Sequence, residues 1–171
     1  NASYLITGGV GALGLQVAQY LASQGACNLV LTGRSGVSTD DQRTTLQALK
    51  DAGVQVEIVT ADIGNEKDVK RVLASTLHLR GIVHAAGVLD DAMLSDQNSE
   101  RFMKVARSKV HGAWHLHKQT IENPMDFFIL FSSVASVIGS PGQSNYAAAN
   151  AFMDGLAHYR RQKGLVATTI N

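Results

Sequence analysis

This 171-residue chain has a single cysteine and almost no net charge. Cys27 is the only cysteine, so an internal disulfide is excluded, and one free thiol fits a reducing compartment. The net charge is +1 without any block of like charges, which gives no reason to expect nucleic acid or a membrane surface as a partner. No apolar run approaches the length of a membrane span, and the N-terminal residues lack a secretory-signal layout. We therefore expect a cytoplasmic protein.

Short β-prone segments alternate with longer helical ones along the chain. The expected strands are Ser3–Thr7, Asn28–Thr32, Val54–Thr60, Gly81–His84, Phe127–Phe131 and Val166–Ile170. The expected helices are Ala12–Ser23, Asp40–Asp51, Glu66–Thr76, Ser99–Thr120 and Ser144–Lys163. Several strands are continuous apolar runs, which is typical of strands buried on both faces. The alternation predicts an α/β fold of the doubly wound Rossmann type, with a parallel sheet and right-handed crossovers.

The domain organisation is simple. The sequence shows no internal repeat and no linker, so we expect residues 1–171 to form a single domain. The chain stops directly after the sixth expected strand, where a full doubly wound enzyme usually continues. We therefore expect a C-terminally incomplete piece of a larger protein.

A glycine-rich turn follows the first expected strand and leads into a helix. Gly9, Gly11 and Gly14 match the pattern G-x-G-x-x-G, in which the glycines allow a tight turn, close approach to a pyrophosphate, and close helix–strand packing. The amides at the helix N-terminus then face the phosphates. The turn predicts a dinucleotide site formed by Thr7, Gly8, Gly9, Gly11, Leu13 and Gly14.

The second expected strand indicates which dinucleotide binds. An NAD enzyme usually carries an acidic residue about 20 positions after the glycine turn, but here no Asp or Glu precedes Asp40. Arg34 and Ser35 stand in that region instead, and a guanidinium beside a hydroxyl suits a 2′-phosphate. The sequence therefore predicts NADPH, with Asp62 and Ile63 after the third strand beside the adenine.

The segment QSNYAAAN (143–150) places Tyr146 and Asn150 one helical turn apart, on one face of the last expected helix. Ser133, thirteen residues before Tyr146, follows the fifth strand at the same edge of the sheet, so both hydroxyls can reach one carbonyl oxygen. Each residue alone is more often structural than catalytic. Taken together, they predict a carbonyl reductase, and the three alanines leave room for cofactor and substrate.

This Ser–Tyr spacing, with TGGVGALG upstream and HAAG at 84–87, resembles the short-chain dehydrogenase/reductase family. Asn150 occupies the position of that family's lysine, and Lys109 in SKVHG is the expected replacement. This exchanged arrangement resembles that of the ketoreductase domains of modular polyketide synthases and animal-type fatty acid synthases. With LTGRSG and IVHAAGVLDDAML also present, the chain resembles a polyketide synthase ketoreductase most. The resemblance implies that Ser133, Tyr146, Lys109 and Asn150 catalyse, and that Ala85, Ala86 and Gly87 contact the cofactor. It implies a β-ketoacyl substrate on the phosphopantetheine of an acyl carrier protein, with neighbouring synthase domains as further partners.

The resemblance also implies a stereochemical outcome. In these ketoreductases an LDD motif, here Leu89-Asp90-Asp91, marks the class that forms a D-configured 3-hydroxyl. The opposite class carries a tryptophan eight residues before the tyrosine, where this chain has Ile138. We therefore expect a D-configured product.

Two other functions stay open from the sequence: a non-catalytic ketoreductase-like module of a synthase, and a stand-alone reductase of small ketones. A metal site is not expected, because His111, His115 and His117 lack a companion H-E-x-x-H or cysteine pair and fit a solvated helix face. Phe102 and Trp114 are expected to be core anchors.

Overall fold

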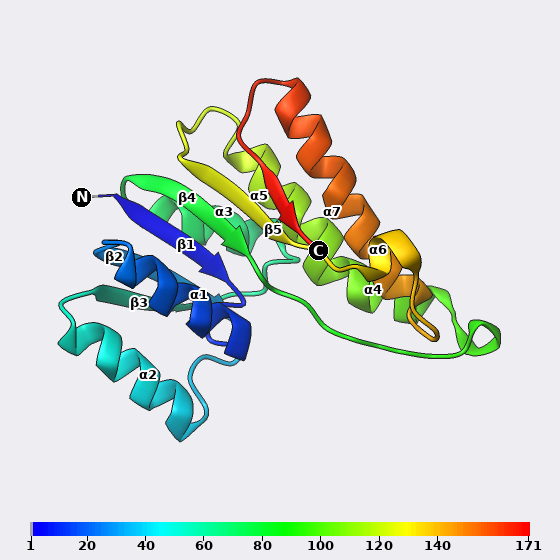
Figure 1. Cartoon of the computed structure of the whole chain (residues 1–171), viewed down its shortest axis with the longest axis horizontal. Coiled ribbons are helices and arrows are strands. Elements are labelled where there is room, and N and C mark those ends of the chain that lie inside the picture. The colour runs from blue at the N-terminus through cyan, green and yellow to red at the C-terminus, as the bar shows by residue number, and fades with distance from the viewer. Residues whose placement is uncertain (1) are drawn as a thin grey trace.

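The computed structural model describes residues 2–171, which form one six-stranded sheet flanked by helices (Figure 1). The strands are β1 (Ser3–Thr7), β2 (Asn28–Gly33), β3 (Gln55–Thr60), β4 (Leu79–His84), β5 (Phe127–Phe131) and β6 (Thr168–Ile170). They lie in the order β3-β2-β1-β4-β5-β6, and all neighbours are parallel. The predicted doubly wound Rossmann-type fold is confirmed.

The helices follow the expected alternation with three differences. They are α1 (Ala12–Ser23), α2 (Asp40–Asp51), α3 (Glu66–Ser75), α4 (Ser99–Ala106), α5 (Gly112–Gln119), α6 (Ala135–Ile138) and α7 (Ser144–Gln162), with a 3₁₀ turn η1 (Leu94–Asp96) and a π-helical turn η2 (Arg107–His111). The π-helical turn divides the helix expected over Ser99–Thr120. The two short elements η1 and α6 were not predicted.

Two apolar cores form, one on each face of the sheet. On one face, α1 and α2 cover the sheet with a core that includes Leu15, Ala18 and Leu46. On the other face, α3, α5 and α7 cover it with a core that includes Val69, Leu116 and Met153. The central strands β1 and β4 face both cores, which explains their continuous apolar sequences.

Side-chain caps start three of the helices. Thr39 forms a capping box with Gln42 at α2, Asn65 accepts from the Lys67 amide at α3, and Asn98 accepts from the Arg101 amide at α4. The N-cap of α1 is Gly11, which has no side chain to cap the helix. The first amides of α1 are therefore left for another acceptor.

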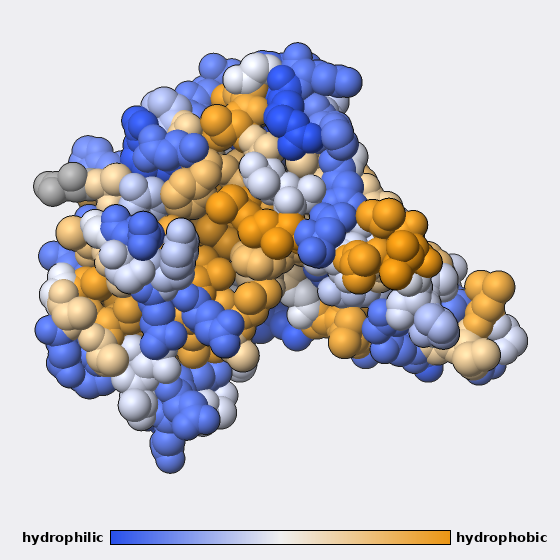
Figure 2. All heavy atoms as spheres, viewed as in Figure 1, coloured by the Kyte–Doolittle hydropathy of each residue, from blue (hydrophilic) through white to orange (hydrophobic). Residues whose placement is uncertain are grey.

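Residues 85–98 form an arm that leaves β4 and extends away from the sheet toward α4 and the start of α7 (Figure 1). The Ala92 amide donates to the Gly142 carbonyl at 2.9 Å, which ties the arm to the loop before α7. Beside it, exposed Val134, Val137 and Ile138 make an apolar patch over α6 (Figure 2). Within residues 2–171, no helix combines the length and apolar character needed to cross a bilayer.

Candidate active site

The carboxyl ends of the parallel strands meet at one edge of the sheet, and the sequence-predicted residues gather there. Thr7 ends β1, Gly33 ends β2 just before Arg34, and His84 ends β4 just before Ala85. Asp62 and Ser133 follow β3 and β5 by two residues. This edge is the ligand-binding edge of doubly wound folds.

The glycine turn wraps closely against β2 and the loop after β4. Gly8 has φ +68°, and a Cβ there would lie 2.8 Å from the backbone of Ala86. The Gly9 amide donates to the Thr32 carbonyl at 2.9 Å, and a Cβ on Gly9 would lie 2.8 Å from that of Leu31. Only glycine fits at these two positions, so the turn packs directly against β2 and the loop after β4.

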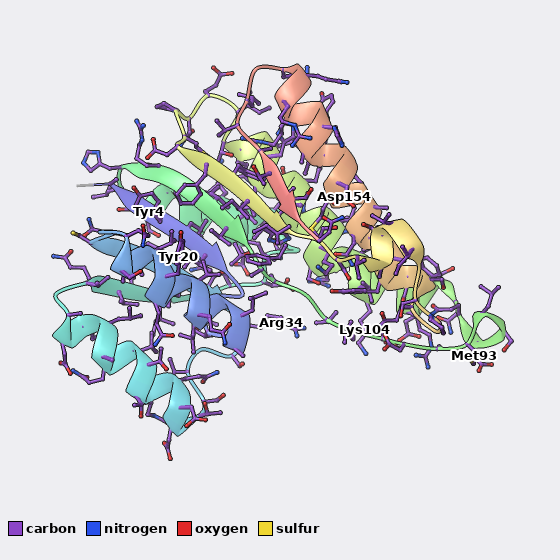
Figure 3. All side chains as sticks on the ribbon, in the orientation of Figure 1. Tyr4, Tyr20, Arg34, Met93, Lys104 and Asp154 are labelled. Atoms are coloured by element: carbon purple, nitrogen blue, oxygen red, sulfur yellow. The ribbon has the colours of Figure 1, made fainter. Side chains whose placement is uncertain are left out.

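A cavity of about 310 Å³, the nucleotide cavity, lies beside this turn. It is bordered by three cations, Arg34, Lys104 and Arg107, and by one acid, Asp62 (Figure 3 labels Arg34 and Lys104). Asp62 pairs with Arg107 at 2.9 Å, whereas Arg34 has no ion-pair partner among residues 2–171. The cavity therefore carries excess positive charge. Its other lining residues are Gly8, Thr32, Gly33, Ala61, Ile63, Ala86, Gly87, Val88 and Ser108.

Lys109 is buried, with 5% of the residue exposed, in the middle of η2. Its Nζ donates to the Phe131 carbonyl at 3.0 Å and to Asn150 Oδ1 at 2.9 Å. Burial lowers the pKa of Lys109 to about 8, against which the charge of Asp154 raises it. The ammonium form is therefore the major one at neutral pH.

Tyr146 and Asn150 lie one turn apart near the start of α7, as predicted. Asn150 Nδ2 donates to the Tyr146 carbonyl at 2.8 Å, which fixes the amide so that its Oδ1 faces Lys109. The Lys109 ammonium lies 5.0 Å from the centroid of the Tyr146 ring. The structure thus brings three of the four predicted catalytic residues into direct contact.

Two of these residues, Lys109 and Tyr146, border a second cavity, of about 260 Å³, which we call the catalytic cavity; Asn150 is buried behind them and does not line it. Its lining includes Tyr146, Lys109 and the exposed Leu89. It shares Gly87 and Val88 with the nucleotide cavity, so the two adjoin. The remaining lining residues are Leu13, Ala85, Phe131 and Ser132.

Ser133, the fourth predicted residue, lies half-buried beside this cavity rather than among its lining residues. Its Oγ accepts a hydrogen bond from the Ala135 amide at 3.2 Å. Ser132 lines the cavity instead, with its Oγ donating to the Asn150 carbonyl at 3.3 Å. Sequence reasoning missed Ser132, although the adjacent serine pair was a signal for it.

The LDD segment lies in the arm and reaches the catalytic cavity through Leu89. Asp90 pairs at 2.8 Å with Lys104 of α4 and also with Arg101, and these cations hold the pKa of its carboxyl below the usual range. Asp91 accepts from Gln143 at 2.9 Å. These contacts tie the arm to α4 and to the start of α7.

Two predicted site residues, Ser35 and Ile138, are exposed and lie outside both cavities.

Three sequence interpretations were wrong. Phe102 of α4 and Trp114 of α5 are each 39% exposed and belong to neither core. His117 is buried rather than solvated, and its Nδ1 lies 3.1 Å from Nη1 of Arg160, a partner 43 residues away. His111 and His115 are half-buried.

Residues 2–171 contain no group of three or more His, Cys, Asp or Glu able to hold a metal.

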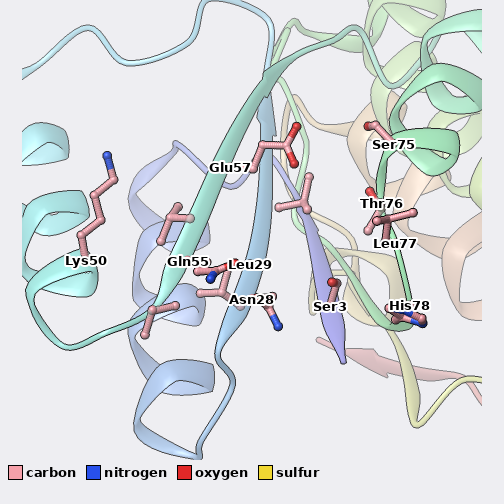
Figure 4. Close-up of a pocket in the computed structure, with 13 residues that line it drawn as sticks. Ser3, Asn28, Leu29, Lys50, Gln55, Glu57, Ser75, Thr76, Leu77 and His78 are labelled. Atoms are coloured by element: carbon pink, nitrogen blue, oxygen red, sulfur yellow. The ribbon is translucent and has the colours of Figure 1, made fainter. Parts of the chain in front are cut away.

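A larger hollow, of about 640 Å³, lies at the opposite edge of the sheet (Figure 4). It is bordered by the amino ends of β1 and β2, by β3, and by the turn from α3 to β4, which contains the exposed Leu77. None of the sequence-predicted site residues lines it. We therefore place the candidate site at the two smaller cavities.

The family model described as KR domain matches residues 2–171. The phthioceranic/hydroxyphthioceranic acid synthase of Mycobacterium tuberculosis is 42% identical over 99% of this chain, and the highly reducing polyketide synthase alnA of Emericella nidulans is 37% identical over 100% of it. The chain spans 8% and 7% of these relatives.

Solved structures agree with the sequence relatives. The structure titled as A-type ketoreductases from a modular polyketide synthase has a TM-score of 0.94 and 41% identity, over 98% of this chain and 36% of that one. An N-terminal ketoreductase from a macrolactin assembly line has a TM-score of 0.90 and 41% identity, over 100% of this chain and 36% of that one. The chain therefore belongs to the KR domain family, the ketoreductase domains of modular polyketide synthases.

Proposed function

We propose that this chain uses NADPH to reduce a β-ketoacyl thioester, presented on the phosphopantetheine of an acyl carrier protein, to a 3-hydroxyacyl thioester. The observation that supports this best is the contact of Lys109 with both Asn150 and Tyr146 on a cavity that adjoins the nucleotide cavity. Membership of the KR domain family, whose polyketide synthase members are oxidoreductases, supports the reaction class.

The residues of the nucleotide cavity fit a dinucleotide that carries a 2′-phosphate. The uncapped N-terminus of α1 and the glycine turn, whose Gly8 lines the cavity, suit a pyrophosphate. Arg34, which is free of ion pairs within residues 2–171, suits the additional phosphate. When bound, NADPH supplies the hydride.

The proton comes from Tyr146 in this proposal. Charge develops on the keto oxygen as the carbon is reduced, and a hydroxyl lining the cavity can donate a proton to it. The Lys109 ammonium then stabilises the phenolate that remains. Asn150 and the Phe131 carbonyl hold that ammonium in place.

Ser133 stabilises the developing oxyanion. Its Oγ accepts from the Ala135 amide, which uses a lone pair but leaves the hydroxyl hydrogen free to donate. A donor aimed at the developing charge is worth most where water is excluded. Rotation of this hydroxyl toward the neighbouring cavity would present it to the substrate.

The proposal is tested by following NADPH oxidation with a carrier-bound β-ketoacyl thioester, using the native full-length protein. Tyr146→Phe keeps the ring but removes the proton donor, so turnover should fall by about a hundredfold or more while NADPH still binds. Tyr159→Phe, at an exposed tyrosine of the same helix, is the matched control and should keep native activity.

Two results would contradict the proposal. Near-native turnover by Tyr146→Phe would remove the proton donor from the mechanism. Absence of thioester reduction despite tight NADPH binding would favour a non-catalytic module, and preference for free small ketones would favour a stand-alone reductase.

A further inference from the structure

The π-helical turn η2 interrupts a continuous helical rod at the position of Lys109. α4, η2 and α5 follow one another without a gap from Ser99 to Gln119. A π-turn inserts an extra residue, so some carbonyls in it lose their ordinary intrahelical partner. Such turns are rare and often occur at functional sites, and a widened turn needs support from outside the helix.

His84, the last residue of β4, lies directly behind this turn. It is 1% exposed, and its Nδ1 lies 2.6 Å from Oγ1 of Thr7, the last residue of β1. Its Nε2 is buried and has no hydrogen-bond partner at standard geometry. This nitrogen lies beside the end of the turn, because a Cβ on Gly112 would stand 3.5 Å from it. The backbone groups of Lys109 and Ser108 also raise the pKa of the ring, against the effect of burial.

The ring is neutral, and its surroundings favour one tautomer. Burial is the largest influence and lowers the pKa of His84 to about 3, with a further lowering by the charge of Lys109. A neutral imidazole carries one N–H. If Nδ1 accepts from the Thr7 hydroxyl, the hydrogen is on Nε2, the ring nitrogen nearer Gly112 at the end of the π-helical turn. We assign this tautomer from the surrounding groups.

The same ring also fills the space at the C-terminal end of the turn. A Cβ at Gly112, the first residue of α5, would lie 3.1 Å from Cε1 of His84 and 2.9 Å from Cγ2 of Ile63. The imidazole therefore packs closely against the helix at Gly112, three residues after Lys109.

We propose that His84 is a positioning residue of the active site, which, held by Thr7, supports the π-helical turn and so places the Lys109 ammonium on Asn150 and the Phe131 carbonyl. The role of Lys109 in catalysis rests on the proposed function. Thr7 also leads into the glycine turn, so the Thr7–His84 pair links the nucleotide cavity to the catalytic lysine.

Substitutions at His84 separate this role from simple filling of the core. His84→Gln keeps an N–H donor close to the position of Nε2, whereas His84→Leu keeps a buried volume without a donor. His84→Leu should lower kcat by about tenfold or more with little change in KM, because a catalytic group displaced by about 1 Å already costs that much. His84→Gln should restore most of kcat.

The pH profile gives a readout that packing alone would not move. The titratable groups facing Lys109 are His84 from β4 and Tyr146 and Asp154 from α7, with Arg107 and His111 on its own turn. A relaxed turn admits water to the ammonium. The alkaline limb of kcat should then move to higher pH in His84→Leu and return in His84→Gln.

Hydrogen exchange of the amides of residues 107–112 tests the structural part without any assay of activity. Exchange should rise in His84→Leu and stay near native in His84→Gln. If His84→Leu does not fold, Thr7→Val removes the hydroxyl partner at nearly constant volume and should raise exchange in the same segment.

The possible outcomes distinguish the two proposals. Equal activity, pH limbs and exchange in His84→Leu and His84→Gln would overturn the role of His84. A native protein that reduces no thioester would overturn the proposed function, while exchange at 107–112 would still decide whether His84 supports the turn.

Discussion

Lys109 carries a charge in a buried position, so its protonation responds to single charges nearby. Burial lowers its pKa to about 8, and Asp154 opposes this lowering. Asp154→Asn removes the opposing charge, so the pKa of Lys109 should fall further and the alkaline limb of kcat should move to lower pH. Asp41→Asn, at an exposed carboxylate of α2, is the control and should leave the profile unchanged.

The same residue makes stability depend on pH. The pKa of Lys109 is about 8 in the folded chain, against an ordinary 10.5, so between these values the unfolded chain binds more protons. The free energy of unfolding therefore rises with pH across this window, by at most about 3 kcal/mol from this group. Urea unfolding at several pH values should show this rise in the native protein, and Lys109→Met should lack it.

Arg34 is the residue on which cofactor choice should depend. Its guanidinium borders the nucleotide cavity without an ion-pair partner among residues 2–171. Arg34→Ala should weaken NADPH binding by about 1.5–3 kcal/mol, the range for a charge-assisted contact, and leave NADH binding nearly unchanged. Titration with both cofactors measures the difference, and equal affinities in the native protein would contradict the assignment.

At the scale of elements, two glycines in different settings make a matched pair. A Cβ at Gly9 would lie 2.7 Å from the Ile6 carbonyl oxygen, so Gly9→Ala should distort the turn and abolish NADPH binding. A Cβ at Gly155, exposed on α7, meets nothing within 4 Å. Gly155→Ala should stabilise the fold by about 0.5–1 kcal/mol and leave activity intact, as thermal unfolding and the reductase assay would show.

The elements themselves were predictable where local patterns are strong. The apolar run of β5 and the capping residues before α2 and α3 act within a few residues, so their sequences predict structure directly. The π-helical turn was not predictable, because the apolar pattern continues through Ser99–Thr120 and the support of the turn comes from His84 on another element. Short α6 has too few residues for a periodic pattern.

The site could be predicted only in part, because some of its contacts join residues that are far apart in the sequence. Tyr146 and Asn150 were placed by helical spacing, and the glycine turn by its motif between a strand and a helix. The contact of Lys109 with Asn150 spans 41 residues and was expected only from the family resemblance. Thr7 and His84 are 77 residues apart, and no local pattern in either segment indicates their pairing.

For the whole molecule, the expected product is the D-configured 3-hydroxyacyl thioester. Leu89 lines the catalytic cavity, and the ion pairs of Asp90 and the Asp91–Gln143 contact fix the arm that carries it. A preference of about 3 kcal/mol between the two substrate poses gives better than a roughly hundredfold bias. Two of the similar solved structures are titled as A-type and A1-type ketoreductases, a label that belongs to those proteins. Chiral analysis of the reduced thioester measures the configuration of its 3-hydroxyl. A mainly L-configured product would contradict the assignment.

The hydrogen bond between Thr7 and His84 has a consequence for the behaviour of the protein in acid. The imidazole titrates near 6.5 in an unfolded chain but near 3 in the folded one, so stability is lost as the pH falls between these values. Protonation of the ring requires that it leave its pocket, which would release Thr7 and the turn around Lys109 together. Mild acid should therefore expel the nucleotide and loosen the turn that carries Lys109 in one cooperative step. Stopped-flow acidification, followed by NADPH fluorescence and by pulsed hydrogen exchange of the amides of residues 107–112, should show both events with a single rate constant in the native protein and at a lower pH in His84→Gln.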